Sequence, residues 1–261
     1  MVTIFISFLI LLYSMSWFYN LLILWILIGL CTFIFLIFSK TVAPYGRHSS
    51  SKWGFTIDNK WGWFWMELPA LLIMPTIILT SSVQKNNIIL LLIFLWVFHY
   101  FYRTILFPLK LNTEGKRMPI VIVVSAFIFN LINGFFLGFE IAYLSSNLIF
   151  GINTVIGVIL FCTGMFINRK SDNKLISLRK NKKEYQIPQG GIFNYISCPN
   201  HFGEIIEWIG FSIILFNLSS LSFAFWTAFN LIPRALNHHN WYNKNFQDYP
   251  ESRKAIIPFI F

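Results

Sequence analysis

Four side chains that could do chemistry lie inside or at the edge of long apolar stretches: Glu67 in WGWFWMELPALLI, Tyr100 and Arg103 in HYFYRTILF, and Glu204 in NHFGEIIEWIG. Charges at membrane depth cost about 2.5–3.5 kcal/mol each on insertion scales and usually mark function. A phenol near a carboxylate and an arginine can donate a strong hydrogen bond to an oxygen that gains negative charge. The set favours polarisation of a carbonyl group. An ion-pair network between helix ends and a tyrosine of the aromatic belt are the open alternatives.

Histidines near this set raise the question of a metal site. His238 and His239 are adjacent in the chain, and His201 precedes Glu204 by three residues. Because the sequence has no HExxH motif and no third ligand at a suitable spacing, we expect no metal. We interpret His99, which is next to Tyr100, as a structural histidine.

The apolar stretches that must position these residues predict an integral membrane protein. Hydrophobic residues make up 56% of the 261-residue chain and charged residues 11%, where a soluble domain has about 25% charged residues. Seven stretches approach the length that spans a bilayer. We expect an all-α bundle in one membrane-embedded domain, residues 1–261. The predicted spans are residues 17–38, 62–81, 87–109, 119–140, 146–167, 204–218 and 220–236.

The basic residues predict how this bundle is oriented. Counted loop by loop after the first span, Lys and Arg number 4, 1, 4, 0, 7, 0 and 4, which together make the 20 of the chain. The positive-inside rule then places the N-terminus outside and the C-terminus in the cytoplasm. The long loops 40–60 and 168–200 fall on the cytoplasmic side, and the segment 187–203 reads as loop. Glu140, at the other end of its span, is interpreted as an interfacial residue.

The net charge of +10 could indicate a nucleic acid, but basic loops at a membrane surface account for it, so we expect no nucleic-acid partner. A nucleotide cofactor with several phosphates would also suit a basic face. Neither GxGxxG nor GxxxxGK[ST] is present, which excludes a Rossmann turn and a P-loop. The richness in Ile, Phe, Asn and Lys is typical of an AT-rich genome and favours a bacterial source.

Longer motifs carry a family resemblance. The C-terminal third contains IPQGGIFNYISCPNHFGEIIEWIGFS and RALNHHNWYNKNFQDYPESRKAIIPFIF. Upstream lie YGRHSS, WFWMELP, HYFYRT, LNTEGKRMP and GMFINRKSDNKLISLRK. Over residues 20–261 the chain resembles the steroid 5-alpha-reductases, and PNHFGE combined with the ending YPxSRKxxIPFxF is the most specific part.

The resemblance implies a seven-span membrane reductase that uses NADPH to reduce the carbon 4–carbon 5 double bond of a 3-keto-4-ene steroid. It implies that Glu67 and Tyr100 hydrogen-bond the 3-keto oxygen and that Trp63 and Met66 line the substrate pocket. It also implies a set of residues at NADPH: Arg47, Arg103, Asn112, Lys116, Asn168, Asp172, Arg179, Asn200, Glu204, Arg234, His238 and Tyr242.

Two positions depart from the family pattern. Lys116 stands where the animal enzymes have an arginine. Met66 stands where they have a glutamine that is thought to engage the steroid, and plant members resemble this chain in having methionine there. The loss of that amide bears on the identity of the substrate more than on the type of reaction.

From the residues and the resemblance together, we expect hydride to reach carbon 5 while Tyr100 and a protonated Glu67 polarise the ketone. The basic residues predict a preference for NADPH over NADH. We expect a lipophilic, steroid-like substrate, contact with membrane lipid, a monomer, and a multi-pass protein of the bacterial inner membrane or, in a eukaryote, of the endoplasmic reticulum.

Three other readings stay open. An enoyl or polyprenyl reductase of the same superfamily would use the same chemistry on a thinner, flexible substrate. A membrane methyltransferase would hold S-adenosylmethionine among its C-terminal helices. A transporter or an inert bundle is disfavoured, because the sequence shows no inverted repeat and its polar residues gather at one end.

Overall fold

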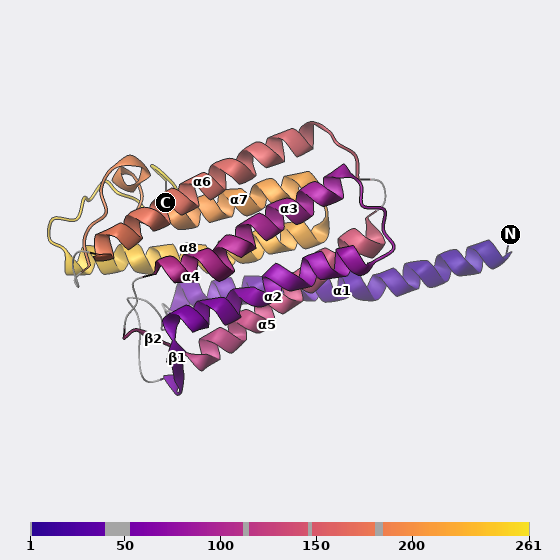
Figure 1. Ribbon diagram of the computed structural model, residues 1–261, viewed down its shortest axis with the longest axis horizontal. Helices are drawn as coiled ribbons and strands as arrows, with labels where there is room; N and C mark the ends of the chain where they lie inside the picture. The colour runs from indigo at the N-terminus through magenta and orange to yellow at the C-terminus, as the bar shows by residue number, and fades with distance from the viewer. Residues whose placement is uncertain (1, 40–52, 112–114, 146–147, 181–184, 261) are drawn as a thin grey trace.

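The computed structural model describes residues 2–39, 53–111, 115–145, 148–180 and 185–260, without the side chains of residues 2–15 and 180. The described residues form a bundle of seven long helices (Figure 1), and the predicted all-α membrane bundle is confirmed. The seven long helices are α1 (Val2–Ser39), α2 (Asn59–Thr80), α3 (Asn87–Phe101), α5 (Ile120–Phe139), α6 (Ile152–Lys180), α7 (Pro199–Leu215) and α8 (Leu218–Asn245). The four-residue α4 (Phe107–Lys110) is counted with α3, which it continues.

Two of these helices contain or end in a π-helical turn. The turn η3 (Tyr102–Leu106) joins α3 to α4 in one continuous helix, and η4 (Glu140–Leu144) extends α5. Such turns are frequent at functional sites because they change the direction in which nearby side chains point. A short antiparallel pair, β1 (Thr56–Asp58) with β2 (Arg117–Pro119), ties the start of α2 to the start of α5.

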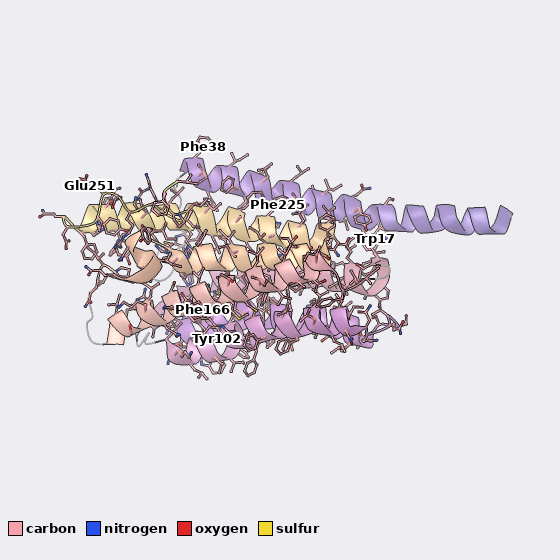
Figure 2. All side chains as sticks on the ribbon, turned by 90° about the horizontal axis from the view of Figure 1, so that it is seen from above. Trp17, Phe38, Tyr102, Phe166, Phe225 and Glu251 are labelled. Atoms are coloured by element: carbon pink, nitrogen blue, oxygen red, sulfur yellow. The ribbon has the colours of Figure 1, made fainter. Side chains whose placement is uncertain are left out.

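Among the described residues, five helices are long and apolar enough to cross a membrane: residues 16–39, 59–80, 87–110, 120–144 and 152–179. Large apolar side chains cover the outside of the bundle, among them Trp17, Phe38, Phe166 and Phe225 (Figure 2). Outward-facing apolar residues are what a lipid environment requires. That α7 and α8 also cross, and that the N-terminus lies outside, stay predictions.

The prediction that residues 168–200 form a loop is wrong at both ends of that segment. Helix α6 continues to Lys180, and α7 already begins at Pro199. A falling hydropathy marks where a helix leaves the apolar layer but does not end the helix itself. Proline is favoured in the first turn of a helix, where its missing N–H would have had no partner. In the segment 187–203, the last residues are therefore helical.

Helices α6 and α7 touch backbone to backbone along a seam of four glycines, which we call the glycine seam. Gly164 faces Gly203 and Gly157 faces Gly210; a Cβ added to Gly164 would lie 2.4 Å from the Gly203 carbonyl oxygen, and one added to Gly157 would lie 2.5 Å from that of Gly210. Small residues allow membrane helices this close approach. The seam fixes the relative height of the two helices and hence of their polar ends.

Helix α2 packs on α5 in a similar way, with Gly134 and Gly138 of α5 against Ile73 and Ile77 of α2. The two helices run side by side in Figure 1. Helix α1 packs on α8, where Gly29 faces the ring of Trp226. Its N-terminal half extends beyond the rest of the bundle (Figure 1).

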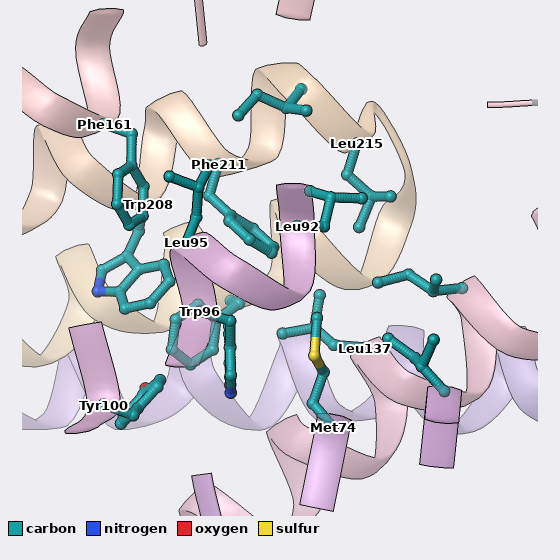
Figure 3. Close-up of a cluster of buried hydrophobic side chains, with 14 of the residues drawn as sticks. Met74, Leu92, Leu95, Trp96, Tyr100, Leu137, Phe161, Trp208, Phe211 and Leu215 are labelled. Atoms are coloured by element: carbon teal, nitrogen blue, oxygen red, sulfur yellow. The ribbon is translucent and has the colours of Figure 1, made fainter. Parts of the chain in front are cut away.

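A buried cluster rich in aromatic side chains joins the α2–α5 pair to the α6–α7 pair (Figure 3). Trp96 of α3 lies with its ring centroid 5.3 Å from that of Trp208 of α7, and its indole N–H donates to the Ala70 carbonyl of α2 at 2.6 Å. The centroid of Tyr100 lies 4.7 Å from that of Trp96. The cluster therefore holds Tyr100 between α2 and α7.

Candidate active site

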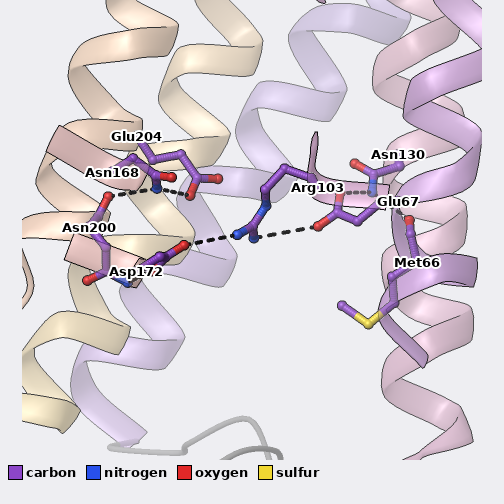
Figure 4. Close-up of polar contacts among 8 residues, drawn as sticks. All are labelled: Met66, Glu67, Arg103, Asn130, Asn168, Asp172, Asn200 and Glu204. Carbon is purple, nitrogen blue, oxygen red and sulfur yellow. Dashed lines mark hydrogen bonds and ion pairs between the residues drawn. The ribbon is translucent and has the colours of Figure 1, made fainter. Parts of the chain in front are cut away.

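Arg103, in the π-helical turn η3, lies at the centre of a buried polar cluster (Figure 4). One guanidinium nitrogen is 3.6 Å from Glu67 Oε1, and the other is 3.6 Å from Asp172 Oδ2. The guanidinium also lies over Trp63 and Phe107, 4.8 Å and 4.9 Å from their ring centroids. A single cation is thus shared by a carboxyl of α2 and a carboxyl of α6.

On the α2 side, Glu67 is 8% exposed and has an amide beside it. Asn130 of α5 donates through Nδ2 to the Met66 carbonyl at 2.7 Å and to Glu67 Oε2 at 3.4 Å. The Met66 side chain is buried with Met118 and Val123. Glu67 therefore has an amide at one oxygen and a guanidinium near the other.

On the α6–α7 side, four polar side chains bond to one another. Asn168 Nδ2 donates to Glu204 Oε2 and to the Asn200 carbonyl, both at 3.1 Å. Asn200 Nδ2 donates to Asp172 Oδ1 at 3.1 Å. The glycine seam brings these residues together, since Gly164 precedes Asn168 by one helical turn and Gly203 adjoins Glu204. Asp172 closes the cluster by facing Arg103.

Tyr100 is 4% exposed and lies between the rings of Trp96 and Trp208. Its neighbour His99 bonds through Nδ1 to Glu207 Oε1 at 2.7 Å, and both are buried. The interpretation of His99 as a paired, structural histidine is confirmed.

Two cations, Lys116 and Arg179, lie beside the ring of Tyr185. Lys116 Nζ is 5.6 Å and the Arg179 guanidinium carbon 5.2 Å from the centroid of that ring. Partial burial, and secondarily the charge of Arg179, lower the pKa of Lys116. Two positive charges held this close to each other suit a ligand with more than one negative charge.

The last part of α8 carries three of the predicted residues, of which His238 contacts the start of α7 and Tyr242 contacts the C-terminal segment. Arg234 and His238 are four residues apart on α8, and the His238 ring lies 5.7 Å from His201 of α7. Tyr242 stacks on Tyr249 with a centroid distance of 5.2 Å. The C-terminal segment thus closes over this end of the bundle.

One hydroxyl secures that segment. Ser197 Oγ lies 2.7 Å from His239 Nδ1 and 2.6 Å from the Tyr249 hydroxyl, and it donates to the Lys254 carbonyl at 3.1 Å. Arg253 is 3% exposed and donates to the Pro188 carbonyl. The specific C-terminal motif noted in the sequence is therefore structural at these positions.

The structure brings together most of the residues that the sequence singles out. Glu67 and Trp63 of α2 contact Arg103, Met66 adjoins Glu67, and Tyr100 stacks on Trp208 of α7. Asp172, Asn168, Asn200 and Glu204 lie on the α6–α7 side of Arg103. Lys116 and Arg179 lie beside Tyr185, and Arg234, His238 and Tyr242 lie in the last part of α8. Arg47 and Asn112 fall outside the described residues. The residues in the described part of the chain form no cluster of three metal-ligating side chains.

Two findings correct or extend the sequence interpretation. Glu140 is not interfacial: it is 3% exposed and accepts from the Ser219 N–H at 2.8 Å and from the Tyr19 hydroxyl at 3.3 Å. Its side chain points into the bundle, where it accepts a hydrogen bond from an N–H in the first turn of α8 that has no partner within that helix. Asn130 was missed, although an amide in the middle of an apolar span is itself a signal of function.

Comparisons with known proteins place the chain in a family. Residues 116–261 match the family described as 3-oxo-5-alpha-steroid 4-dehydrogenase. Steroid 5-alpha-reductase DET2 of Arabidopsis thaliana is 40% identical over 230 residues, which cover 84% of this chain and 88% of that protein.

Animal proteins are similar over a comparable length. For 3-oxo-5-alpha-steroid 4-dehydrogenase 2 of Sus scrofa the identity is 39% over 225 residues, with 83% of this chain and 87% of that protein covered. For 3-oxo-5-alpha-steroid 4-dehydrogenase 1 of Homo sapiens the identity is 36% over 233 residues, with 85% and 88% covered. This chain, with its helical membrane bundle and its buried cluster around Arg103, therefore belongs to the steroid 5-alpha-reductase family of membrane enzymes.

Proposed function

We propose that this enzyme reduces the carbon 4–carbon 5 double bond of 3-keto-4-ene steroids with NADPH. The relatives named above carry that activity in their names. The observation that carries the proposal is a buried carboxyl, Glu67, beside Arg103, together with a buried phenol, Tyr100, three residues before Arg103 in the same continuous helix of an apolar bundle. A lipophilic ketone can reach such a site from lipid, and the two groups can address its oxygen.

The residues on the other side of Arg103 fit a dinucleotide by their chemistry. Amides and carboxylates at Asn168, Asn200, Asp172 and Glu204 suit the carboxamide and the ribose hydroxyls. Lys116 and Arg179, together with the predicted contributions of Arg47, Asn112, Arg234, His238 and Tyr242, suit the pyrophosphate and the 2′-phosphate. Bound NADPH supplies the hydride that adds to carbon 5, while carbon 4 takes a proton.

The chain itself polarises the ketone. Tyr100 donates its hydroxyl proton as a hydrogen bond, and Glu67 in its neutral form donates a second. Pulling electron density onto the ketone oxygen makes the beta carbon of an enone electrophilic. Arg103 supports a change in the charge of Glu67, because Asp172 stays as its partner when Glu67 takes up a proton. The apolar bundle excludes water, which strengthens both hydrogen bonds.

The test is NADPH consumption by the purified protein in nanodiscs with a panel of 3-keto-4-ene steroids, with the product identified by mass spectrometry. Tyr100→Phe removes one donor and is expected to lower turnover on the order of a hundredfold. Tyr143→Phe, the same change at an exposed tyrosine near the opposite end, is the matched control. Near-normal turnover by Tyr100→Phe would exclude the role given to this phenol.

The alternatives have separate readouts. Turnover of a trans-2-enoyl thioester or a polyprenyl substrate, with none of the steroids, would assign the protein to another branch of the superfamily. Thermal stabilisation by S-adenosylmethionine and not by NADPH would contradict reduction altogether. Met66 does not decide between a steroid and a long-chain enoyl or polyprenyl substrate, so substrates of both kinds are assayed.

We also propose a monomer with its N-terminus outside and its polar end in the cytoplasm, which the distribution of Lys and Arg supports. The composition favours a bacterial source, for which the membrane would be the inner one; in a eukaryote it would be the endoplasmic reticulum. Labelling of single cysteines from each side of the membrane tests the orientation, and the mass of the detergent-solubilised particle tests the monomer.

A further inference from the structure

Asn130 and Asn133 are two buried amides in the largely apolar helix α5, and only Asn130 contacts the Glu67 carboxyl. Asn130 is 6% exposed and lies in the middle of the predicted span of α5. Burying an amide in an apolar layer is costly unless it is hydrogen-bonded. Asn130 meets that need across the α2–α5 contact, at the backbone of Met66 and at the carboxyl of Glu67 (Figure 4).

The orientation of this amide follows from its partners. The Met66 carbonyl can only accept a hydrogen bond, so the Asn130 side chain must direct its nitrogen, and not its oxygen, at α2. The same nitrogen lies 3.4 Å from Glu67 Oε2. Oε2 must therefore accept as well. If Glu67 is neutral, its proton resides on Oε1.

Oε1 is held in a different manner. Its nearest cation is the Arg103 guanidinium at 3.6 Å, which is longer than a hydrogen bond. That guanidinium also has Asp172 as a partner at the same distance. Within the described residues, Oε2 of Glu67 thus accepts one long hydrogen bond, and Oε1 has a cation just beyond hydrogen-bond distance, so a ligand donor or acceptor could compete at Oε1.

We propose that Asn130 is a positioning residue that selects Oε1 of Glu67 as the oxygen that donates to the substrate ketone. The role rests on the proposed reductase function and extends it to a residue of α5. Without the amide, the carboxyl can rotate and its proton can occupy either oxygen. The fraction of Glu67 that is ready to donate then falls, which reduces turnover more than the binding of either substrate.

Asn130→Leu in the nanodisc-embedded full chain tests this role. We expect kcat to fall on the order of 10- to 100-fold, as for other small losses of alignment in an active site. The Kd for NADPH, measured by fluorescence without steroid, is expected to stay within about twofold, because the contacts of Asn130 are on the other side of Arg103. Asn130→Asp, which keeps the shape but sets a carboxyl against Glu67, is expected to lose at least as much.

Asn133→Leu is the matched control. Asn133 is a buried amide one turn along the same helix, and its bonds go to Trp25 and to the Phe129 carbonyl and not to Glu67. This variant is expected to keep kcat within about twofold, since sites without shared partners act independently. An equal loss of kcat in Asn133→Leu would show that any damage to α5 has this effect, and would overturn the proposal.

The sharpest readout is a double-mutant cycle with Glu67→Leu. A glutamine at this position could still accept from Asn130 and donate to the ketone, so leucine is used in its place. If Asn130 acts through Glu67, adding Asn130→Leu to Glu67→Leu is expected to change kcat by no more than about twofold further. An undiminished loss in the Glu67→Leu background would contradict the proposal. Should the wild-type enzyme reduce no 3-keto-4-ene steroid, the proposed function fails by itself. The same cycle measured by thermal unfolding without substrate then decides whether Asn130 and Glu67 are coupled, and additive shifts would overturn the contact.

Discussion

Two of the buried glutamates lie near opposite ends of the bundle, and they are held in different ways. Glu140, at the end of α5, accepts a hydrogen bond from a backbone N–H of α8 at 2.8 Å and one from a tyrosine hydroxyl at 3.3 Å, and its charge interacts favourably with the dipole of α8. Glu67, at the polar end, has an amide at 3.4 Å and a guanidinium at 3.6 Å. Glu140 therefore has one short hydrogen bond from the fold, and Glu67 has only long contacts.

The difference indicates which buried charge is part of the fold and which one serves a ligand. A carboxylate with short partners has nothing to gain from another donor or acceptor. A buried carboxyl with long contacts retains part of the cost of its desolvation, which a ligand can offset. Burial alone does not distinguish the two residues, since both are less than 10% exposed: Glu67 at 8% and Glu140 at 3%.

The largest expected effect is at Glu67. Glu67→Leu removes a donor to the ketone, so turnover is expected to fall on the order of a hundredfold or more. Because Arg103 keeps Asp172, the melting temperature is expected to change little. Steady-state assays and differential scanning fluorimetry measure the two quantities. A large loss of stability with activity retained per folded molecule would reverse the comparison.

The glycine seam offers the second test, because one of its glycine pairs adjoins the polar cluster and the other lies two helical turns away along α6. Gly164→Ala and Gly157→Ala introduce clashes of similar severity, each expected to cost about 1–3 kcal/mol of unfolding free energy. Only Gly164 adjoins the Asn168–Glu204 bond. We therefore expect Gly164→Ala alone to weaken NADPH binding, measured by fluorescence titration. Equal weakening by both would show that the two ends are not independent.

Glu140→Gln is the converse of the change at Glu67. It replaces a charge-assisted acceptor of the Ser219 N–H by a neutral one, and about 1–2 kcal/mol of unfolding free energy is expected to be lost. Activity per folded molecule is expected to stay near that of the wild type. Denaturant unfolding combined with the steroid assay checks both. Loss of turnover without loss of stability would give Glu140 a role in the reaction.

Arg179→Gln probes the outer cations of the polar end. Loss of a charge next to the predicted 2′-phosphate is expected to narrow the preference for NADPH over NADH by about tenfold. Lys244→Gln, which removes an exposed cation at the end of α8, is the control and is expected to leave the preference unchanged. The ratio of kcat/KM for the two dinucleotides is the measurement. An unchanged ratio in Arg179→Gln would remove this residue from the cofactor site.

The smallest expected effect is a dependence on pH at the C-terminal segment. Burial, and then the charges of Arg253 and Lys254, lower the pKa of His239 from 6.5. As pH falls, the unfolded segment therefore takes up the proton first, and the stability present above about pH 6.5 is lost below it. The hydrogen-exchange protection factors of residues 246–260, corrected for the intrinsic pH dependence of amide exchange, are expected to fall as the pH is lowered from 7.5 to 5.5, and less so in His239→Asn. Protection factors that rise on acidification would contradict this sign.

Much of the fold could be predicted, because a membrane imposes its own length and polarity on helices. All seven predicted spans overlap helices of the structure. Polar residues at membrane depth indicated Glu67, Tyr100, Arg103 and Glu204, whereas Asn168, Asp172 and Asn200 came from the family resemblance. The ends of helices were less accessible. Helix α6 runs on past Ile167 into polar residues, and hydropathy reports contact with lipid and not hydrogen bonding of the backbone.

The pairing of the site residues could not be predicted, because it depends on how helices are rotated against each other. Nothing in the sequence says that Arg103 faces Glu67 and Asp172 together, since the π-helical turn η3 shifts it from the regular helical position. The roles of Asn130 and Glu140 were hidden for the same reason. The glycines of α6 and α7 are visible in the sequence, but their partners become evident only when the helices are placed together.

The glycine seam gives the α6–α7 half of the enzyme a fixed geometry, whereas the α2–α5 half can adapt. Because the main chains of α6 and α7 are in contact, any side chain larger than glycine at the seam would collide with the facing helix, so the spacing of these two helices is expected to change little during evolution. The α2–α5 half is lined by Met66 and Met118, whose flexible side chains can repack around a new shape. Changes of substrate range, natural or engineered, are therefore expected to accumulate on α2 and α5 while the nucleotide half stays as it is.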